Sequence, residues 1–266
     1  LSLIEANGAP SPSSPGHPTL LSPHSDPIAV HQGKVFVVNT PADTLDVIDT
    51  ATEQIVTRIP TGIDPVSVSV RPDGKEVWVS NHISDSVSVI DNHSENATYL
   101  SVIATIQDID LEKKSTRFNE PVGIAFANNT KAYVALSSSN QIAVVDVAAR
   151  RVTKYLKITA QEPRAIAVRN CKLYVLPFDS NNQTQLSGGK EEDIDGELVT
   201  FNAQKLAGSF DSAGFTVDIV KNAKIPDRDL YIFDTETDEL IQTVGSLGTN
   251  LFAIAIHEAA NVFIPN

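Results

Sequence analysis

The sequence has a single cysteine, Cys171, and no methionine among its 266 residues. One cysteine excludes an internal disulfide framework, a cysteine-rich zinc motif and the C-x-x-C-H attachment of covalent haem. Basic residues are also scarce: 20 Lys and Arg stand against 33 Asp and Glu, a formal net charge of −13. Nucleic acid and an anionic membrane are therefore poor partners. No apolar run reaches the length of a membrane-spanning helix, so we expect no membrane insertion.

Motifs with catalytic or metal-binding spacing are missing too. The chain has no G-x-S-x-G, no phosphate-cradling glycine loop and no dinucleotide fingerprint. Its six histidines show neither H-x-H nor H-E-x-x-H spacing, so no zinc site is encoded locally. We therefore assign no catalytic residue, and any cofactor is unknown at this point.

Short runs of alternating apolar residues fill most of the chain. Three of them follow one another between Asp64 and Asp91: Val66–Val70, Val77–Val79 and Val87–Val89. Period-two alternation is expected of strands that bury one face, and the Pro-Asp-Gly between the first two runs favours a hairpin turn. This stretch is predicted to be a β meander.

The same meander recurs along the chain. An aromatic residue in the second strand precedes the aspartate that ends the third strand by 13 positions in three copies, Phe36 to Asp49, Trp78 to Asp91 and Tyr133 to Asp146. Tyr174 and Phe263 take the same aromatic position in two further copies. Four strands in about 40 residues, repeated, predict the blades of a β-propeller. The phased aromatics are expected to fill the layers between neighbouring blades.

Segments such as VWVSNHISDSVSVID and VFVVNTPADTLDVIDTATEQIVTRIPTGIDPVSV resemble the YVTN family of β-propeller repeats. The resemblance covers about residues 26–170 and resumes at 229–266. It implies an all-β fold of four-stranded antiparallel blades, of the seven-bladed type. The chain supplies about four blades and the start of a fifth, so we expect an open arc or a piece of a longer protein. The resemblance also implies an exported bacterial or archaeal protein, periplasmic or extracellular, with relatives fused to c-type cytochromes.

Two insertions interrupt the repeat. Residues 1–25, rich in proline and serine, are expected to form an irregular lead-in, and residues 26–266 form the propeller domain. The insertions fall at about residues 107–119 and 177–228. Because successive strands run antiparallel, both insertions should lie on the face that carries the turn from Asn81 to Asp85. Function on repeat scaffolds gathers where insertions do, so this face is the predicted recognition surface.

On that face, near the expected central channel, an acidic residue stands where the chain enters the first strand of each of four blades. These residues are Asp26, Asp64, Glu120 and Glu162. Their oxygens could hold calcium or a cationic group of a ligand. Alternatively, each acid accepts backbone N–H groups at its own turn. Asn81, His82 and Asp85 are further candidates for ligand binding, since a His–Asp pair could serve acid–base work, although the three could equally form an ordinary polar turn.

Three functions are compatible with these patterns. The first is a binding module for a small molecule, a glycan or a protein, with recognition on the face of the insertions. The second, by analogy with the family's relatives, is the propeller domain of a redox enzyme of c-type cytochrome or quinone-dependent type, its redox centre outside this chain. The third is a lactonase- or hydrolase-like enzyme with its site at the channel mouth. The absence of catalytic spacing favours the first over the third.

Overall fold

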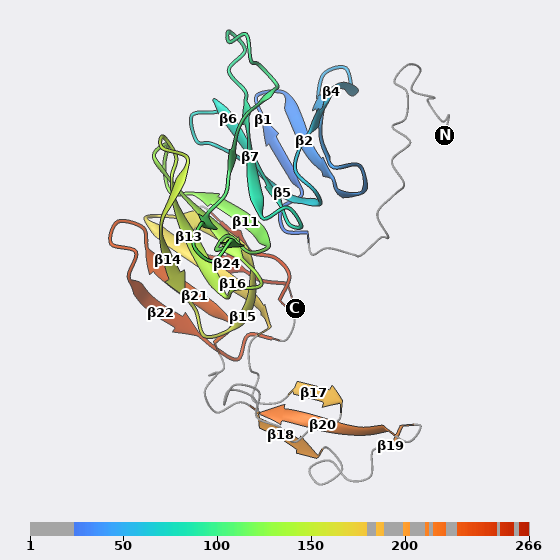
Figure 1. Cartoon of the computed structure of the whole chain (residues 1–266), viewed down its shortest axis with the longest axis vertical. Helices are drawn as coiled ribbons and strands as arrows, with labels where there is room; N and C mark the ends of the chain where they lie inside the picture. The colour runs from blue at the N-terminus through green and yellow to red at the C-terminus, as the bar shows by residue number, and fades with distance from the viewer. Residues whose placement is uncertain are drawn as a thin grey trace.

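The computed structural model describes residues 24–179, 185–188, 199–202, 211–212, 215–221, 228–248, 251–257 and 261–265. Four sheets of four strands follow one another along the chain, and in each sheet sequential neighbours pair antiparallel (Figure 1). This is the blade pattern predicted from the repeat, and the all-β propeller architecture is confirmed. Within the described ranges, no helix has the length and apolar character that crossing a bilayer requires.

Each blade is a meander of four strands. Blade 1 consists of β1 (Ile28–His31), β2 (Lys34–Asn39), β3 (Thr44–Asp49) and β4 (Gln54–Pro60), with a 3-10 turn at Thr40–Ala42. Blade 2 consists of β5 (Pro65–Val70), β6 (Glu76–Asn81), β7 (Ser86–Asp91) and β8 (Val102–Ile106). Blade 3 consists of β11 (Pro121–Phe126), β12 (Lys131–Leu136), β13 (Gln141–Asp146) and β14 (Arg151–Lys157). Blade 4 consists of β15 (Gln161–Arg169), β16 (Lys172–Asp179), β21 (Leu230–Asp234) and β22 (Leu240–Val244). The fifth copy begins with β23 (Ala255–Ile256) and β24 (Val262–Phe263).

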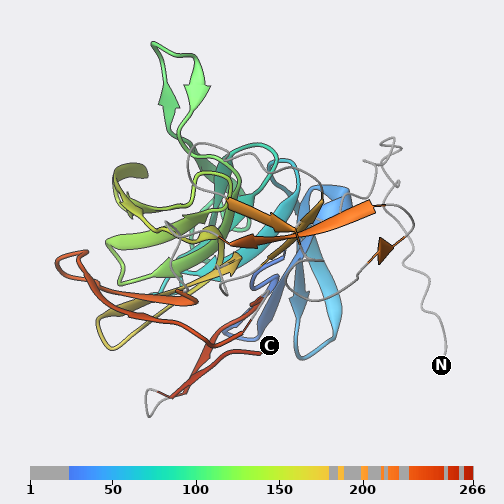
Figure 2. The ribbon, with the colours of Figure 1, turned by 90° about the horizontal axis from the view of Figure 1, so that it is seen from below.

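The remaining strands lie in the segments that interrupt the repeat. β9 (Ile109–Asp110) and β10 (Ser115–Thr116) form a hairpin that projects from the blades in Figure 2. A separate small sheet lies below the blades in Figure 1. Its strands are β17 (Gln185–Gly188), β18 (Val199–Asn202), β19 (Asp211–Ser212) and β20 (Phe215–Lys221). Residues 1–23 lie outside the described residues, so the boundaries of the lead-in and of the insertions stay predictions.

The phased aromatics occupy the layers between blades, as predicted. Phe36, Trp78, Tyr133 and Tyr174 are buried, each in the apolar cluster that joins its own blade to the next. Trp78 packs edge-on against Phe126 of blade 3, with ring centroids 5.0 Å apart. Removing each such side chain from water stabilises the fold by roughly 1.5–3 kcal/mol. The interfaces between blades are therefore the core of the molecule.

Phe263 departs from this pattern. It holds the aromatic position of the fifth copy, yet 58% of its surface is exposed. The reason is packing: the structure describes no blade beyond β24 that would cover it. The expectation that every phased aromatic fills a layer between blades is thus met by four of the five.

Charged residues tie neighbouring blades together on the face of the short turns, which we call the tight-turn face. Glu76, at the start of β6, meets Arg150 of the β13–β14 turn at 3.2 Å. One blade further on, Lys131 at the start of β12 meets Asp238 of the β21–β22 turn at 2.6 Å. Both pairs join the same positions of the repeat, and their signs are reversed.

Candidate ligand-binding site

We call the opposite face the insertion face. It carries the turns between the second and third strands of each blade and the connections that run from the fourth strand of one blade to the first strand of the next. One hydrogen bond recurs there. The residue that ends the turn accepts the backbone N–H of the acid that opens the next blade. The bonds run from Asp64 to Asp43 Oδ1 (2.8 Å), from Glu120 to Asp85 Oδ1 (2.8 Å) and from Glu162 to Asn140 Oδ1 (2.9 Å). These contacts show that the turns and the blade-opening acids lie together, as antiparallel strands require.

The backbone explains why Asp and Asn occur at these turns. Asp43, Asp85 and Asn140 have φ values of 54°, 48° and 52°, in the left-handed region that their short polar side chains tolerate. The blade-opening acids are left-handed as well, with φ of 47° at Glu120 and 52° at Glu162. Holding glutamate there costs about 1 kcal/mol, which the hydrogen bond to the preceding turn offsets.

A cavity of about 360 Å³ opens on the insertion face where these turns meet. Its volume is in the range of pockets that hold small molecules. The cavity is lined by residues of blades 2, 3 and 4 and of the connections between them. They are His82, Glu120, Ser137, Ser138, Asn140, Gln161, Glu162 and Arg164.

His82 forms part of the cavity wall and is only 7% exposed. Its backbone N–H donates to Asp64 O at 2.9 Å, which holds the turn in place. Its ring makes no hydrogen bond with any residue in the described part of the chain: Nδ1 is enclosed without a partner, and Nε2 lies 3.8 Å from Glu120 Oε2. That distance exceeds a hydrogen bond. Buried polar groups nearly always have a partner, so a buried ring with no hydrogen bond is unusual.

Glu120 presents a carboxylate that is not neutralised. Its side chain is 46% exposed, and no lysine or arginine of the described residues lies within ion-pair distance. Ser137 Oγ is 3.4 Å from Oε2, a long contact, and His82 is the other neighbour. The carboxylates of Glu120 and Glu162 accept bonds from side chains, Ser137 for Glu120 and Arg164 for Glu162. Glu120 therefore keeps acceptor capacity toward the cavity.

Glu162 and Arg164 also line the cavity, and their charges neutralise each other. They make a close ion pair, and Arg164 also stacks on the ring of Phe178 at 3.8 Å from its centroid. The Arg164 side chain is only 17% exposed, and its Nε is buried without a partner. Stacking and ion pairing hold the planar guanidinium in one orientation. The cavity wall thus has one ion pair, Glu162 with Arg164, whose charges cancel, and one carboxylate, that of Glu120, that no lysine or arginine of the described residues neutralises.

The other predicted residues do not line this cavity. Asn81 is buried beneath the turn, where its Nδ2 donates to Ser86 and Ser88 hydroxyls at 3.1 and 3.0 Å. Asp85 contributes through Glu120, whose N–H it accepts, and does not pair with His82 in any hydrogen bond of the structure. Asp64 and Asp26 lie at other blade openings. The structure brings together Glu120, Glu162 and His82 of the seven predicted residues.

The four blade-opening acids do not gather around one point. Among the described residues, no three His, Cys, Asp or Glu side chains come together as metal ligands would. Calcium at Asp26, Asp64, Glu120 and Glu162 stays a prediction.

Arg164 is the residue of this site that the sequence pattern missed. It stands two positions after Glu162, where blades 2 and 3 carry the buried valines Val66 and Val122. The sequence did carry a signal for Arg164, because a charged residue stands there at a position that is apolar in blades 2 and 3. Its partner Phe178 lies on β16, so the stacking itself was visible only in three dimensions.

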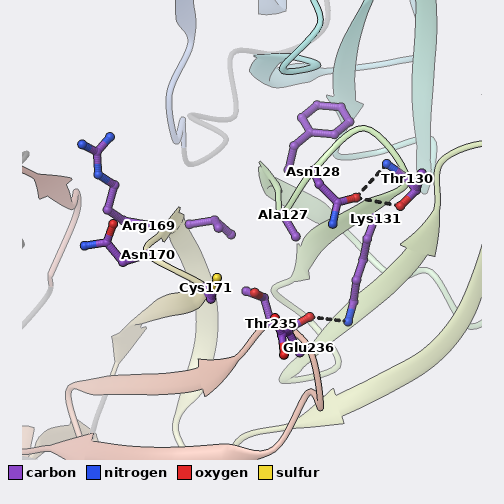
Figure 3. Close-up of a pocket in the computed structure, with 11 residues that line it drawn as sticks. Ala127, Asn128, Thr130, Lys131, Arg169, Asn170, Cys171, Thr235 and Glu236 are labelled. Carbon is purple, nitrogen blue, oxygen red and sulfur yellow. Dashed lines mark hydrogen bonds between the residues drawn. The ribbon is translucent and has the colours of Figure 1, made fainter.

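A larger cavity of about 740 Å³ lies on the tight-turn face between blades 3 and 4 (Figure 3). Several of its polar groups bond to one another: Lys131 Nζ donates to Thr235 O at 2.8 Å, and Asn128 Oδ1 accepts the N–H and hydroxyl of Thr130. The free thiol of Cys171 is exposed there. Because Lys131, Asn128 and Thr130 are already bonded within the wall, we place the candidate site in the smaller cavity on the insertion face.

The fold and its repeats define the chain as a β-propeller repeat protein. The model of a family described as YNCE-like beta-propeller matches residues 18–120, which include blades 1 and 2, and this confirms the resemblance to propeller repeats. No curated protein matches the sequence at a significant level.

Solved structures show the same fold. Hydrazine synthase of Kuenenia stuttgartiensis is 17% identical with a TM-score of 0.52, over 91% of this chain and 72% of that one. The WD40 beta propeller domain of Doa1 is 10% identical with a TM-score of 0.57, over 89% of this chain and 58% of that one. At these identities the similarity concerns the fold alone.

Proposed function

We propose that the protein is a ligand-binding propeller module that holds a small polar molecule in the cavity formed by His82, Glu120 and Arg164. The observation that carries this proposal is the ring of His82, buried in the cavity wall without a hydrogen bond. Of its two ring nitrogens, Nδ1 is enclosed without a partner, and Nε2 has Glu120 Oε2 as a neighbour at 3.8 Å, beyond hydrogen-bond distance. A bound molecule placed between Nε2 and that oxygen would give Nε2 a hydrogen-bond partner.

The composition of the wall supports the same proposal. Donors and acceptors of several kinds face the cavity: a carboxylate at Glu120, hydroxyls at Ser137 and Ser138, and an amide at Gln161. A few convergent polar groups that fix orientation are typical of small-molecule sites. The cavity also lies on the face that carries the hairpin β9–β10, where recognition was predicted.

An exported protein, periplasmic or extracellular, is the setting we propose for this activity, on the strength of the resemblance to YVTN repeats. The similarity of fold to hydrazine synthase is what supports a redox-enzyme alternative. The hydrolase alternative rests on the channel-mouth position alone, and we favour binding over both.

A thermal-shift panel tests the proposal with four probes of different chemistry: glucose, glycine, succinate and putrescine. We expect at least one to raise the Tm of the wild type. Ser138→Trp, at an exposed position of the wall, should fill the cavity and abolish the rise. Ser101→Trp, exposed on the tight-turn face, is the matched control and should keep it. If no probe raises the Tm, or if Ser138→Trp leaves the rise intact, the proposed function is wrong.

A further inference from the structure

We propose that the ligand is a small organic amine whose primary ammonium group binds between Glu120 and His82. This inference rests on the proposed function and adds the chemical class of the ligand. Glu120 Oε2 and His82 Nε2 are 3.8 Å apart. One nitrogen can lie at about 2.8–2.9 Å from both atoms, so the gap between these two side chains fits a single donor group of a ligand.

The number of donors favours an ammonium group over a hydroxyl group. Glu120 Oε2 is an acceptor, His82 Nε2 is one in the tautomer that carries its proton on Nδ1, and Ser137 Oγ has lone pairs 3.4 Å from Glu120 Oε2. An ammonium has three N–H donors, enough to bond Glu120 Oε2 and His82 Nε2 together and keep a third donor for a neighbouring acceptor. A hydroxyl has one donor and leaves part of the set unpaired.

The charge around the cavity favours the same class. Glu162 and Arg164 cancel each other, which leaves Glu120 as the unneutralised charge of the wall. The carboxylate of Asp85 lies close behind it and accepts the Glu120 N–H at 2.8 Å. A ligand carboxylate placed beside Glu120 would be repelled, whereas an ammonium gains a charge-assisted hydrogen bond. The net charge of −13 also attracts cations over a longer range.

A metal ion is a weaker fit to the same place. A divalent cation needs several oxygen ligands, and in the described part of the chain no three acidic, histidine or cysteine side chains gather to supply them. An organic amine brings its own donors and needs only acceptors from the protein. The volume of about 360 Å³ suits a molecule the size of a diamine.

The test compares putrescine with 1,4-butanediol, which has the same chain length and hydroxyls in place of amines. We expect calorimetry to show binding of putrescine to the wild type and none of butanediol. Glu120→Gln should weaken putrescine binding about tenfold or more, because it removes the charge and keeps the shape. Glu112→Gln, an exposed acid of the β9–β10 hairpin, removes the same charge elsewhere and should bind as the wild type does.

The outcomes separate this inference from the proposed function. If butanediol or glucose binds as tightly as putrescine and Ser138→Trp abolishes that binding, the ammonium inference fails and the proposed function stands. Equal putrescine affinity of Glu120→Gln and Glu112→Gln also overturns the inference. If none of the probes binds, both fail. The Tm of Glu120→Gln without ligand, expected near that of the wild type, shows that the variant is folded.

Discussion

The side chain of Asn140 accepts the backbone N–H of Glu162 at 2.9 Å and so joins the β12–β13 turn of blade 3 to the start of blade 4. Asp85 makes the same bond to Glu120 one blade earlier. The bond uses the backbone of each blade-opening acid and leaves its carboxylate for other contacts. The walls of the candidate site are thus positioned by a structural repeat.

The first prediction concerns this bond. Asp85→Asn should keep the stability of the wild type, because Asn140 makes the same contact with an amide oxygen. Asp85→Gly keeps the left-handed backbone at low cost but removes the acceptor, and should lower the free energy of unfolding by about 1–2 kcal/mol. Urea unfolding of both variants gives the comparison. Equal stability of the two would show that the hydrogen bond contributes nothing.

The second prediction concerns pH. Burial alone would raise the pKa of Asp238, but hydrogen bonds from Lys131, Lys154 and Tyr133 outweigh it and hold the pKa below its usual value. A depressed carboxyl pKa contributes stability above the unfolded pKa of about 3.9, and this contribution is lost as the pH falls through the folded value. Asp238→Asn should therefore be destabilised relative to the wild type at pH 7, with the difference shrinking at pH 3.

Guanidinium unfolding at the two pH values measures this effect. The control is Glu236→Gln, an exposed acid two positions away in the same turn, for which we expect no more than a small change at either pH. A wild-type advantage over Asp238→Asn that persists undiminished at pH 3 would contradict the assignment.

The third prediction concerns the layer between blades 2 and 3. Trp78 is the only tryptophan, is fully buried, and donates from Nε1 to Glu76 at 2.9 Å. Trp78→Ala should cost about 3–5 kcal/mol through the cavity it leaves. Phe263→Ala, at the same repeat position but exposed, should change stability by about 0.5 kcal/mol or less. Thermal unfolding followed by circular dichroism compares them, and similar losses would refute the packing argument.

The fourth prediction concerns the close approach of two inner strands. A Cβ on Gly123 of β11 would overlap the carbonyl oxygen of Arg164 on β15. Gly123→Ala should therefore cost about 1–3 kcal/mol, because backbone must move. Ser67 occupies the same position in blade 2, and its buried hydroxyl has no partner. Ser67→Ala should be neutral or slightly stabilising, and a neutral Gly123→Ala would contradict the predicted overlap.

Much of the fold was predictable because it depends on local repetition. Period-two alternation and the phased aromatics Phe36, Trp78 and Tyr133 report strands and layers directly. Of the candidate site, the repeat phase predicted Glu120 and Glu162, and the polar turn predicted His82. That only two of the four blade-opening acids share a cavity was not predictable, since it depends on how neighbouring blades are packed. The exposure of Phe263 likewise follows from what lies beside it in space.

The contacts that specify the site in detail arise between distant residues. Arg164 stacks on Phe178 across two strands, and the tie from Glu76 to Arg150 joins residues of different blades. The sequence does not indicate which residues pair, because the partners lie on different strands or in different blades. Sequence periodicity predicts the scaffold; the partner of each charge comes from three-dimensional packing.

The two ion pairs between blades, Glu76 with Arg150 and Lys131 with Asp238, have reversed signs at the same repeat positions. This reversal affects which blades can pair during folding. Were blade 4 to dock directly on blade 2, Asp238 would face Glu76, carboxylate against carboxylate. Were blade 3 of one molecule to dock on blade 3 of another, Lys131 would face Arg150. Repeats of similar sequence are prone to such skipped and swapped pairings during folding, and like charges at these positions disfavour them. The reversed signs thus disfavour these two wrong pairings of blades.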